Sequence, residues 1–275
     1  MKSKAAGDPM SKCRPCVITL LTDFGYQDAY VGIMKGVITR INPVVKIIDI
    51  CHNVSPQNIL NGAYLLYTSY KYFPAGTIHV AIVDPGVGSK RDIVCVKTRN
   101  YLFVVPNNGI LSFVVKEEKP EYIIRITNNK YFLPSISNTF HGRDIFAPVA
   151  AYLSLEIKLR QLGKKINQLE LLDIPAVKAK NNEQLEGNII YVDRFGNLIT
   201  NITKQHIKSL EINYKYLKIF IGKKKIIGMS KNYADVNKGK PLALFGSTGF
   251  LEISINHGNA QKYFKVNTGS KIYVR

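Results

Sequence analysis

Two carboxylates stand where buried strands are expected to end. Asp23 lies near the end of the β-rich run 16–25, and Asp84 ends the run 76–84 and enters a Pro-Gly turn, with Arg91 seven residues further on. One interpretation of Asp84 is a plain strand-end turn, because Asp, Pro and Gly all favour turns. The other is a ligand site, because open α/β sheets bind ligands at the carboxyl ends of parallel strands. In such a sheet both carboxylates would line one cleft.

Three further stretches combine side chains that could bind or react. The stretch 138–146 carries His141, Arg143 and Asp144 before an expected helix. The stretch 192–201 contributes an Asp, an aromatic ring, a Gly and two Asn, and 245–252 places Ser and Thr between glycines. Three ionisable groups beside Gly142 indicate a functional turn, and solvation at the surface is the alternative for the stretch 138–146. The sequence has no His-Glu-x-x-His pattern, and its five His are scattered, so no metal site is expected.

Composition indicates a globular chain of one large domain or two ordinary ones. It has 275 residues, of which 46% are apolar. No apolar run approaches the roughly 18 residues that would span a bilayer, and the first residues lack the apolar core of a secretory signal. The four Cys are few, and Cys13 and Cys16 precede the first expected strand, whereas a redox CxxC normally opens a helix after a strand. A reducing cytoplasmic location is predicted.

The net charge of +19 is large for a chain of this length. Residues 1–175 hold 21 basic and 13 acidic side chains, and residues 176–275 hold 17 and 6. Such an excess is compatible with nucleic-acid binding or with steering of anions. The basic residues are scattered, however, and the densest cluster, 223–225, is typical of a solvated loop. Nucleic acid is therefore not the expected partner.

The elements that must position these side chains follow from periodicity. Strands and helices alternate in the first half: we expect strands within 16–25, 44–50 and 76–84, a hairpin over 92–109, and helices over 28–42, 55–73, 109–117 and 144–155. After about residue 175 short strands and turns predominate, which is typical of a sandwich or barrel. We therefore predict a flexible extension over 1–15, an α/β domain with a parallel sheet over 16–175 and an all-β domain over 185–275.

Six motifs in order make a resemblance specific. The chain resembles the S-adenosylmethionine hydroxide adenosyltransferase family, the hydrolase branch related to the adenosyl-fluorinases and chlorinases. The motifs are LLTDFGYQDAYVGIMKGVI, IVDPGVGSKR, PNNGIL, TFHGRDIFAPVAAYL, DRFGNLITNI and GNA, spread over nearly the whole chain from about residue 16. The resemblance implies a Rossmann-like N-terminal α/β domain and a small C-terminal β-barrel. It also implies a homotrimer, with each site between one subunit's N-domain and its neighbour's C-domain.

The resemblance further implies the reaction and its residues. S-adenosylmethionine and water would give adenosine and methionine, with no cofactor. Asp84, Arg91 and His141 match the family's water-orienting triad, and Asp23 would accept the ribose hydroxyls. The remaining residues implied in substrate binding are Asp193 for the ammonium, Ser247 for the carboxylate, and Asn197, Phe195 and the backbone at Asn256 for adenine. Thr248 is a departure, because the halogenating relatives carry an arginine there.

Two other functions remain open at this point. A halogenase of the same superfamily is disfavoured, because those relatives carry a tyrosine at position 84 and an anionic Asp84 would repel a halide. A non-catalytic protein that binds an adenosyl ligand or nucleic acid would explain the basic charge without using the triad. Its affinity would fall steeply with salt concentration if nucleic acid were the ligand.

Overall fold

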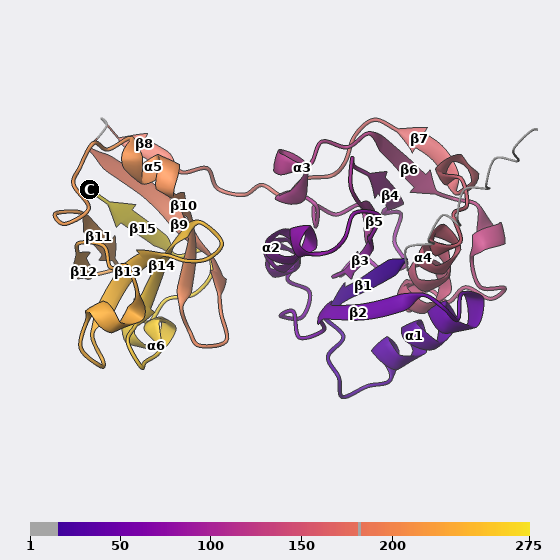
Figure 1. Cartoon of the computed structure of the whole chain (residues 1–275), viewed down its shortest axis with the longest axis horizontal. Helices are drawn as coiled ribbons and strands as arrows, with labels where there is room; N and C mark the ends of the chain where they lie inside the picture. The colour runs from indigo at the N-terminus through magenta and orange to yellow at the C-terminus, as the bar shows by residue number, and fades with distance from the viewer. Residues whose placement is uncertain (1–15, 181–182) are drawn as a thin grey trace, which may run out of the picture. The chain divides into compact units, whose positions relative to one another are not determined.

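The structure is a computed structural model that describes residues 16–180 and 183–275. The expected extension 1–15 and Cys13 of the CxxC pair lie outside the described residues. The described chain divides into two compact units (Figure 1). The first contains residues up to Asn58, Ser69–Ile110 and Val114–Glu170, and the second contains Ile59–Thr68, Leu111–Phe113 and Leu171–Arg275.

The first unit is built on a mixed sheet with the strand order β2-β1-β3-β5-β4-β6-β7. Strands β2, β1, β3 and β5 run parallel, and the other three are antiparallel to their neighbours. The strands are β1 (Val17–Thr22), β2 (Lys46–Cys51), β3 (Ile78–Ile82), β4 (Ile93–Lys97), β5 (Leu102–Pro106), β6 (Tyr122–Ile126) and β7 (Gly163–Ile166). The expected strands and hairpin are confirmed, whereas β6 and β7 were not predicted, so the sheet is only partly parallel.

One face of this sheet is covered by two packed helices, α1 (Tyr30–Ile41) and α4 (Ala147–Ser154), which Figure 1 shows together. Alternate residues of β1 and β3, such as Ile18 and Val80, are buried in the same apolar cluster as Met34 and Val149 on those helices. Burial of an apolar face is the main favourable contribution to packing helices on a sheet. It fixes the strand ends that carry Asp23 and Asp84.

Three expected helices have different limits in the structure. Helix α2 (Ile59–Ser69) does not begin near Ser55, because Gln57 has a left-handed φ of 62° and its backbone N–H donates to the Asp23 carboxylate. Helix α3 (Val114–Glu117) is one turn long and is preceded by turns at 109–113. Helix α4 is preceded by a π-helical turn, Gly142–Phe146. At the start of α2, the Gln57 hydrogen bond to Asp23 thus takes the place of the expected helical turn.

The sheet of the second unit follows the order β12-β11-β15-β9-β10-β14-β13, with β8 beside β9. Strands β12 and β13 at its two ends lie in contact, so the sheet nearly closes into a barrel around one apolar cluster. The strands are β8 (Lys178–Lys180), β9 (Gln184–Val192), β10 (Leu198–Thr203), β11 (Lys218–Ile221), β12 (Lys224–Ile227), β13 (Pro241–Phe245), β14 (Phe250–Ile255) and β15 (Lys271–Val274). Two short helices, α5 (Lys204–Lys208) and α6 (Ala260–Phe264), were not expected.

The fold class is thus mixed α/β with two large sheets in the described residues. Across 16–180 and 183–275, no helix is both long enough and apolar enough to cross a bilayer.

A buried histidine in the first unit gives a prediction for acid stability. His79 on β3 is fully buried among aromatic rings, its Nδ1 lies 2.7 Å from the Thr19 hydroxyl, and burial lowers its pKa to about 3. In the unfolded chain the pKa is about 6.5. Between pH 3 and pH 6.5, His79 therefore binds a proton only in the unfolded state. The free energy of unfolding is unaffected by His79 above pH 6.5, and it falls by about 1.4 kcal/mol for each pH unit below 6.5 until about pH 3.

Urea unfolding at several pH values will check this prediction. Between pH 6 and 4, the free energy of unfolding should depend less steeply on pH in His79→Phe than in the wild type. The difference should correspond to the uptake of close to one proton on unfolding. His52, whose pKa is also lowered by burial, keeps its own contribution in both proteins. Equal slopes for the two proteins would contradict the prediction.

Candidate active site

The centre of the candidate site is an ion pair at the end of β3. Asp84 comes two residues after the strand, and its carboxylate accepts hydrogen bonds from Arg91 Nε at 2.8 Å to each oxygen. Arg91 Nη2 also contacts Asp84 Oδ2. Both side chains are largely buried, with 5% of the Asp84 side chain and 10% of the Arg91 side chain exposed. A bidentate pair of this kind holds the carboxylate in one orientation.

A glycine turn brings this pair to the loop that carries the histidine. Gly88 has a φ of 77°, which favours glycine, and a Cβ at this position would collide with the main-chain oxygen of Asn138. The turn is closed by backbone bonds from Val87 to Asp84 and from Ser89 to Gly86. The loop after β3 can therefore lie directly against residues 137–141.

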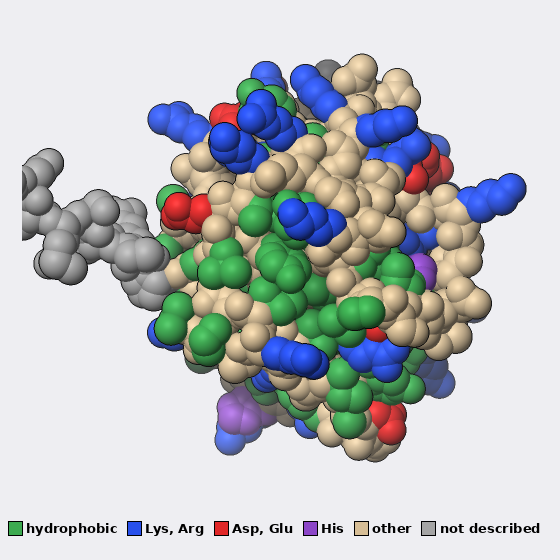
Figure 2. All heavy atoms as spheres, turned by 90° about the vertical axis from the view of Figure 1, so that its right-hand side faces the viewer, with side chains coloured by type: hydrophobic (Ala, Val, Ile, Leu, Met, Phe, Trp, Pro, Cys, Tyr) green, Lys and Arg blue, Asp and Glu red, His purple; other side chains and the backbone are tan. Residues whose placement is uncertain are grey.

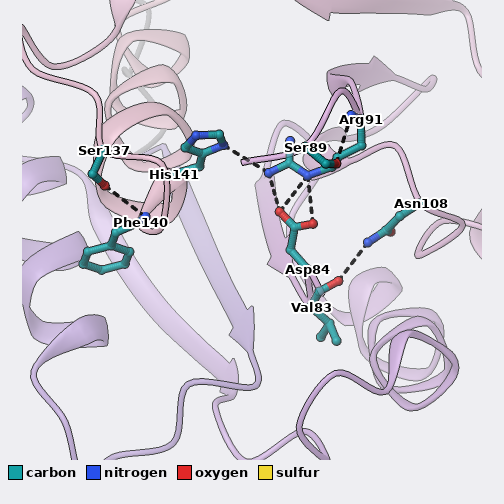
Figure 3. Close-up of polar contacts among 8 residues, drawn as sticks. All are labelled: Val83, Asp84, Ser89, Arg91, Asn108, Ser137, Phe140 and His141. Atoms are coloured by element: carbon teal, nitrogen blue, oxygen red, sulfur yellow. Dashed lines mark hydrogen bonds and ion pairs between the residues drawn. The ribbon is translucent and has the colours of Figure 1, made fainter. Parts of the chain in front are cut away.

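His141 completes the cluster through Arg91. Its Nδ1 lies 3.2 Å from Arg91 Nη2 (Figure 3). Because a guanidinium can only donate, Nδ1 is the acceptor and a neutral ring carries its proton on Nε2. Burial, and then the charge of Arg91, lower the pKa of His141, although Asp84 opposes the shift. His141 is therefore a neutral imidazole near pH 7 that orients the guanidinium.

A second carboxylate fixes the loop before His141. Asp144 is completely buried and accepts from the backbone N–H and the hydroxyl of Ser137, both at 2.8 Å, and from Arg143 Nε at 2.6 Å. Burial alone would raise the pKa of Asp144, but the Arg143 and Ser137 hydrogen bonds outweigh it and lower the pKa. The Ser137 hydroxyl in turn accepts from the Phe140 N–H. Asp144 and Arg143 thus stabilise the loop and do not join the Asp84 cluster.

A cavity of about 140 Å³ in the first unit joins Asp84 and His141 to Asp23. The expected juxtaposition of Asp23 and Asp84 is confirmed, because β1 and β3 are parallel neighbours with Thr22 opposite Ile82. The cavity is lined by Asp23, Phe24, Tyr30, Ile82, Asp84, Val87, Thr139, Phe140, His141 and Gly142. The aromatic wall was not anticipated: the rings of Phe24, Tyr30 and Phe140 lie 5.0–6.0 Å apart, centroid to centroid.

Sequence reasoning also missed the role of an asparagine at the neighbouring strand end. Asn108, which follows β5, donates from its side-chain amide to the main-chain oxygen of Val83 at 2.9 Å (Figure 3). Its side-chain oxygen accepts from the Ile110 N–H. The motif PNNGIL contained the signal, because an Asn after a parallel strand can tie two strand ends together. The bond holds the peptide that carries Asp84.

In the second unit, one turn gathers three of the residues implied by the resemblance. Asp193 Oδ1 accepts from the backbone N–H groups of Phe195 and Asn197, and Asp193 Oδ2 accepts from the Asn197 side-chain amide at 2.8 Å. Asn197 is buried, whereas the Phe195 ring is 76% exposed. The Asp193 charge is therefore held in place by three donors, and the ring is free to cover a ligand.

The two remaining implied residues lie elsewhere in the second unit. Ser247 is exposed in the turn between β13 and β14. Asn256, just after β14, is buried, and its side chain donates to the Val236 oxygen at 2.6 Å. No group of three or more His, Cys, Asp or Glu side chains within 16–180 and 183–275 is arranged to hold a metal ion.

A carboxylate at the end of a parallel strand pairs with a guanidinium and an imidazole from neighbouring loops, and it opens on a cavity with a second carboxylate. This arrangement defines a small-molecule site of a two-sheet α/β protein. Comparison with known proteins names the family. Residues 18–163 match the SAM hydroxide adenosyltransferase N-terminal domain, and residues 187–273 match the C-terminal domain of the same family. The chain belongs to the SAM hydroxide adenosyltransferase family.

Relatives with the same extent are known. A protein of Methanocaldococcus jannaschii named (R)-S-adenosyl-L-methionine hydrolase is 37% identical over 91% of this chain and 92% of its own. A protein of the same name from Thermus thermophilus is 30% identical over 93% and 98%. A fluorinase of Actinopolyspora mzabensis is 24% identical over 96% and 98%. The crystal structure of an uncharacterized conserved protein from Thermotoga maritima, 37% identical, has a TM-score of 0.88 over 94% of this chain and 99% of that chain.

Proposed function

We propose that the protein hydrolyses S-adenosylmethionine to adenosine and methionine. The observation that carries this proposal is the Asp84–Arg91–His141 cluster, which opens on the same cavity as Asp23. The names of the relatives, which are hydrolases of this substrate, agree with it. The three aromatic rings and two carboxylates of the cavity suit a sulfonium cation, since aromatic faces and negative charge both attract cations.

The reaction needs neither a general acid nor a metal ion to activate the leaving group. A water oxygen attacks ribose C5′, the C5′–S bond breaks, and its electron pair neutralises the sulfonium to give the methionine thioether. One proton leaves the attacking water. Because a sulfonium leaves without protonation, catalysis rests on placing the water in line and excluding competing solvent.

The cluster divides these tasks. Asp84 accepts a hydrogen bond from the water and draws the proton away from it. Arg91 orients Asp84 and compensates its charge through bonds to both oxygens. His141 Nδ1 is already occupied by Arg91, so His141 orients the guanidinium and is not the base. Asn108 fixes the Val83–Asp84 peptide and is a positioning residue.

The rest of the substrate is assigned by the resemblance. Asp23 accepts the ribose hydroxyls, Asp193 binds the methionine ammonium, and Ser247 binds the methionine carboxylate. Phe195 and Asn197, with the backbone at Asn256, bind adenine. Three features support these roles: the Asp193 carboxylate is held by three donors, the Phe195 ring is exposed, and Ser247 is accessible.

The active assembly is proposed to be a homotrimer in which a neighbouring copy completes each site. The cavity of the first unit, at about 140 Å³, is smaller than the roughly 300–1,000 Å³ of pockets that hold whole ligands. Tyr30, Ile33 and Val87, on or beside its lining, are 44%, 40% and 37% exposed, as expected for a surface that a partner covers. Light scattering at micromolar concentration should give three times the mass of the chain. A fully active monomer would contradict this assembly.

The domain folds and the cellular compartment of the protein are also part of the proposal. We describe residues 16–175 as a Rossmann-like domain and 185–275 as a β-barrel domain, and the two family matches, over 18–163 and 187–273, support this division of the chain. We place the protein in the cytoplasm, and we expect no nucleic-acid partner. In Figure 2, the Lys and Arg side chains of the visible face are scattered and form no continuous basic surface.

Halogenation is the second candidate, because fluorinases are among the relatives. Asp84 argues against it. A halide at the position of the water would face a carboxylate at short range, where the repulsion in a partly dry site amounts to several kcal/mol. Incubation with S-adenosylmethionine and chloride or fluoride should therefore yield adenosine and no 5′-halogenated adenosine.

Incubation of the purified protein with S-adenosylmethionine, followed by chromatography, tests the proposed function. We expect adenosine and methionine in equal amounts, with rates unchanged by EDTA, because the sulfonium needs no Lewis acid and the described residues contain no metal-binding group. Loss of activity with the chelator and its return with a divalent ion would contradict the metal-independent mechanism. Absence of adenosine would contradict the proposed function itself.

A further inference from the structure

We propose that a chain of polar contacts, Lys35–Asp49–His52–Thr22, positions the Asp23 carboxylate and thereby sets the affinity for the ribose of the substrate. The inference rests on the proposed function, in which Asp23 binds the ribose hydroxyls. None of the four residues lines the cavity, so each is a positioning residue.

The chain of contacts runs from α1 across β2 to the end of β1. Lys35 Nζ donates to Asp49 Oδ2 at 2.6 Å, and Asp49 Oδ1 lies 3.1 Å from His52 Nε2. His52 Nδ1 lies 2.8 Å from the Thr22 hydroxyl. The Nε2 and Oδ1 atoms are both buried, and neither makes a hydrogen bond of standard geometry to a described residue, so the 3.1 Å contact is the polar contact between them. A carboxylate can only accept, so Nε2 carries the proton and Nδ1 accepts from the Thr22 hydroxyl.

His52 fixes the chain on both sides of Asp23. Before Asp23, the Thr22 hydroxyl binds His52 and also accepts from the Phe24 N–H at 3.3 Å. After Asp23, the Gly25 N–H donates to the main-chain oxygen of His52 at 2.7 Å, with Gly25 at a left-handed φ of 68°. The segment that follows His52 also supplies the Gln57 N–H, which donates to Asp23 Oδ2. Two strand-end loops thus hold one carboxylate.

The same strand contains a natural control. Thr19 is three residues before Thr22 on β1, both threonines are completely buried, and the Thr19 hydroxyl lies 2.7 Å from Nδ1 of another buried histidine, His79. Replacing either threonine by valine removes one buried hydroxyl and leaves one histidine nitrogen without a partner. Thr22→Val also removes the acceptor of the Phe24 N–H, which is part of the proposed support of Asp23.

The experiment compares Thr22→Val, Thr22→Ser and Thr19→Val. We expect Thr22→Val to raise KM for S-adenosylmethionine about tenfold with kcat within about threefold, because Asp23 is assigned to the ribose, and a weaker ribose contact lowers ground-state and transition-state binding alike. Thr22→Ser, which keeps the hydroxyl, should restore KM, and Thr19→Val should leave it unchanged. With the 3′-deoxyribose analogue of the substrate, Thr22→Val and the wild type should differ less, because part of the Asp23 contact is already absent.

Lys35→Met provides a second route, because the Lys35 side chain is 36% exposed and its replacement should leave folding intact. It should raise KM in the same direction, by a smaller factor. Equal KM values for Thr22→Val and Thr19→Val, or no change for Thr22→Val on either substrate, would overturn the inference while leaving the proposed function intact. Wild-type turnover that does not distinguish the substrate from its deoxy analogue would instead overturn the ribose role of Asp23, and the inference with it.

Discussion

Asp84→Ala should abolish turnover and leave the affinity for S-adenosylmethionine within about tenfold of the wild type, or roughly 1.4 kcal/mol. The carboxylate is assigned to the attacking water and not to the substrate, so its loss removes general-base assistance, which contributes about 10²–10⁴-fold in rate. Loss of water orientation adds to this. Some weakening of binding is expected, because a negative charge near the sulfonium is removed. Calorimetric binding and a turnover assay on the same preparation will check both parts.

Two controls separate this effect from a loss of folding. Removing Asp84 leaves the largely buried Arg91 without its partner, which is destabilising, so thermal unfolding of the variant must be measured beside its activity. Asp92→Ala removes another Asp that is paired with an arginine, Arg125 at 2.9 Å, but is not part of the cavity lining. It should keep near-normal turnover. A folded Asp84→Ala protein with near-normal turnover would show that Asp84 does not handle the water.

Asp23→Ala should affect substrate binding more than turnover, in contrast to Asp84→Ala, and should lose most of the affinity for the substrate. Two hydroxyl groups bound to one carboxylate contribute about 1.5–3 kcal/mol each. Their loss corresponds to a fall in affinity of roughly 10²-fold or more. Turnover of substrate at saturation should fall less than in Asp84→Ala, because the water-handling cluster remains. Calorimetry with S-adenosylmethionine is the direct measurement.

The Asp23 carboxylate also accepts from the Gln57 backbone, so a matched variant is needed. Asp23→Asn keeps one side-chain oxygen for that bond, but it replaces the other acceptor oxygen and the charge with a donor NH2 group, so it should still bind weakly. Asp28→Ala, in the same loop but exposed and not part of the cavity lining, should bind normally. If Asp84→Ala lost affinity as severely as Asp23→Ala, the separation of water handling from substrate binding would be wrong.

Much of the first sheet and the placing of its two carboxylates could be predicted from the order of residues alone. Apolar periodicity located β1, β2, β3 and the β4–β5 hairpin, because a buried strand needs an apolar run whatever its neighbours are. The same reasoning put Asp23 and Asp84 at one sheet edge, since parallel strands end on the same side. It did not find β6 or β7, because each is only four or five residues long, and β7, at the edge of the sheet, carries two exposed lysines.

Which polar side chains pair with one another, in contrast, is decided only by the tertiary structure. Arg91 could have paired with any nearby acid. The left-handed turn at Gly88 brings its loop against residue 138, where Arg91 joins Asp84 to His141. Arg143 and Asp144, equally close in sequence to His141, pair with each other instead, because burial of Asp144 requires donors that Ser137 and Arg143 supply. Hydrogen-bond partners are chosen by three-dimensional proximity and burial, which sequence spacing does not encode.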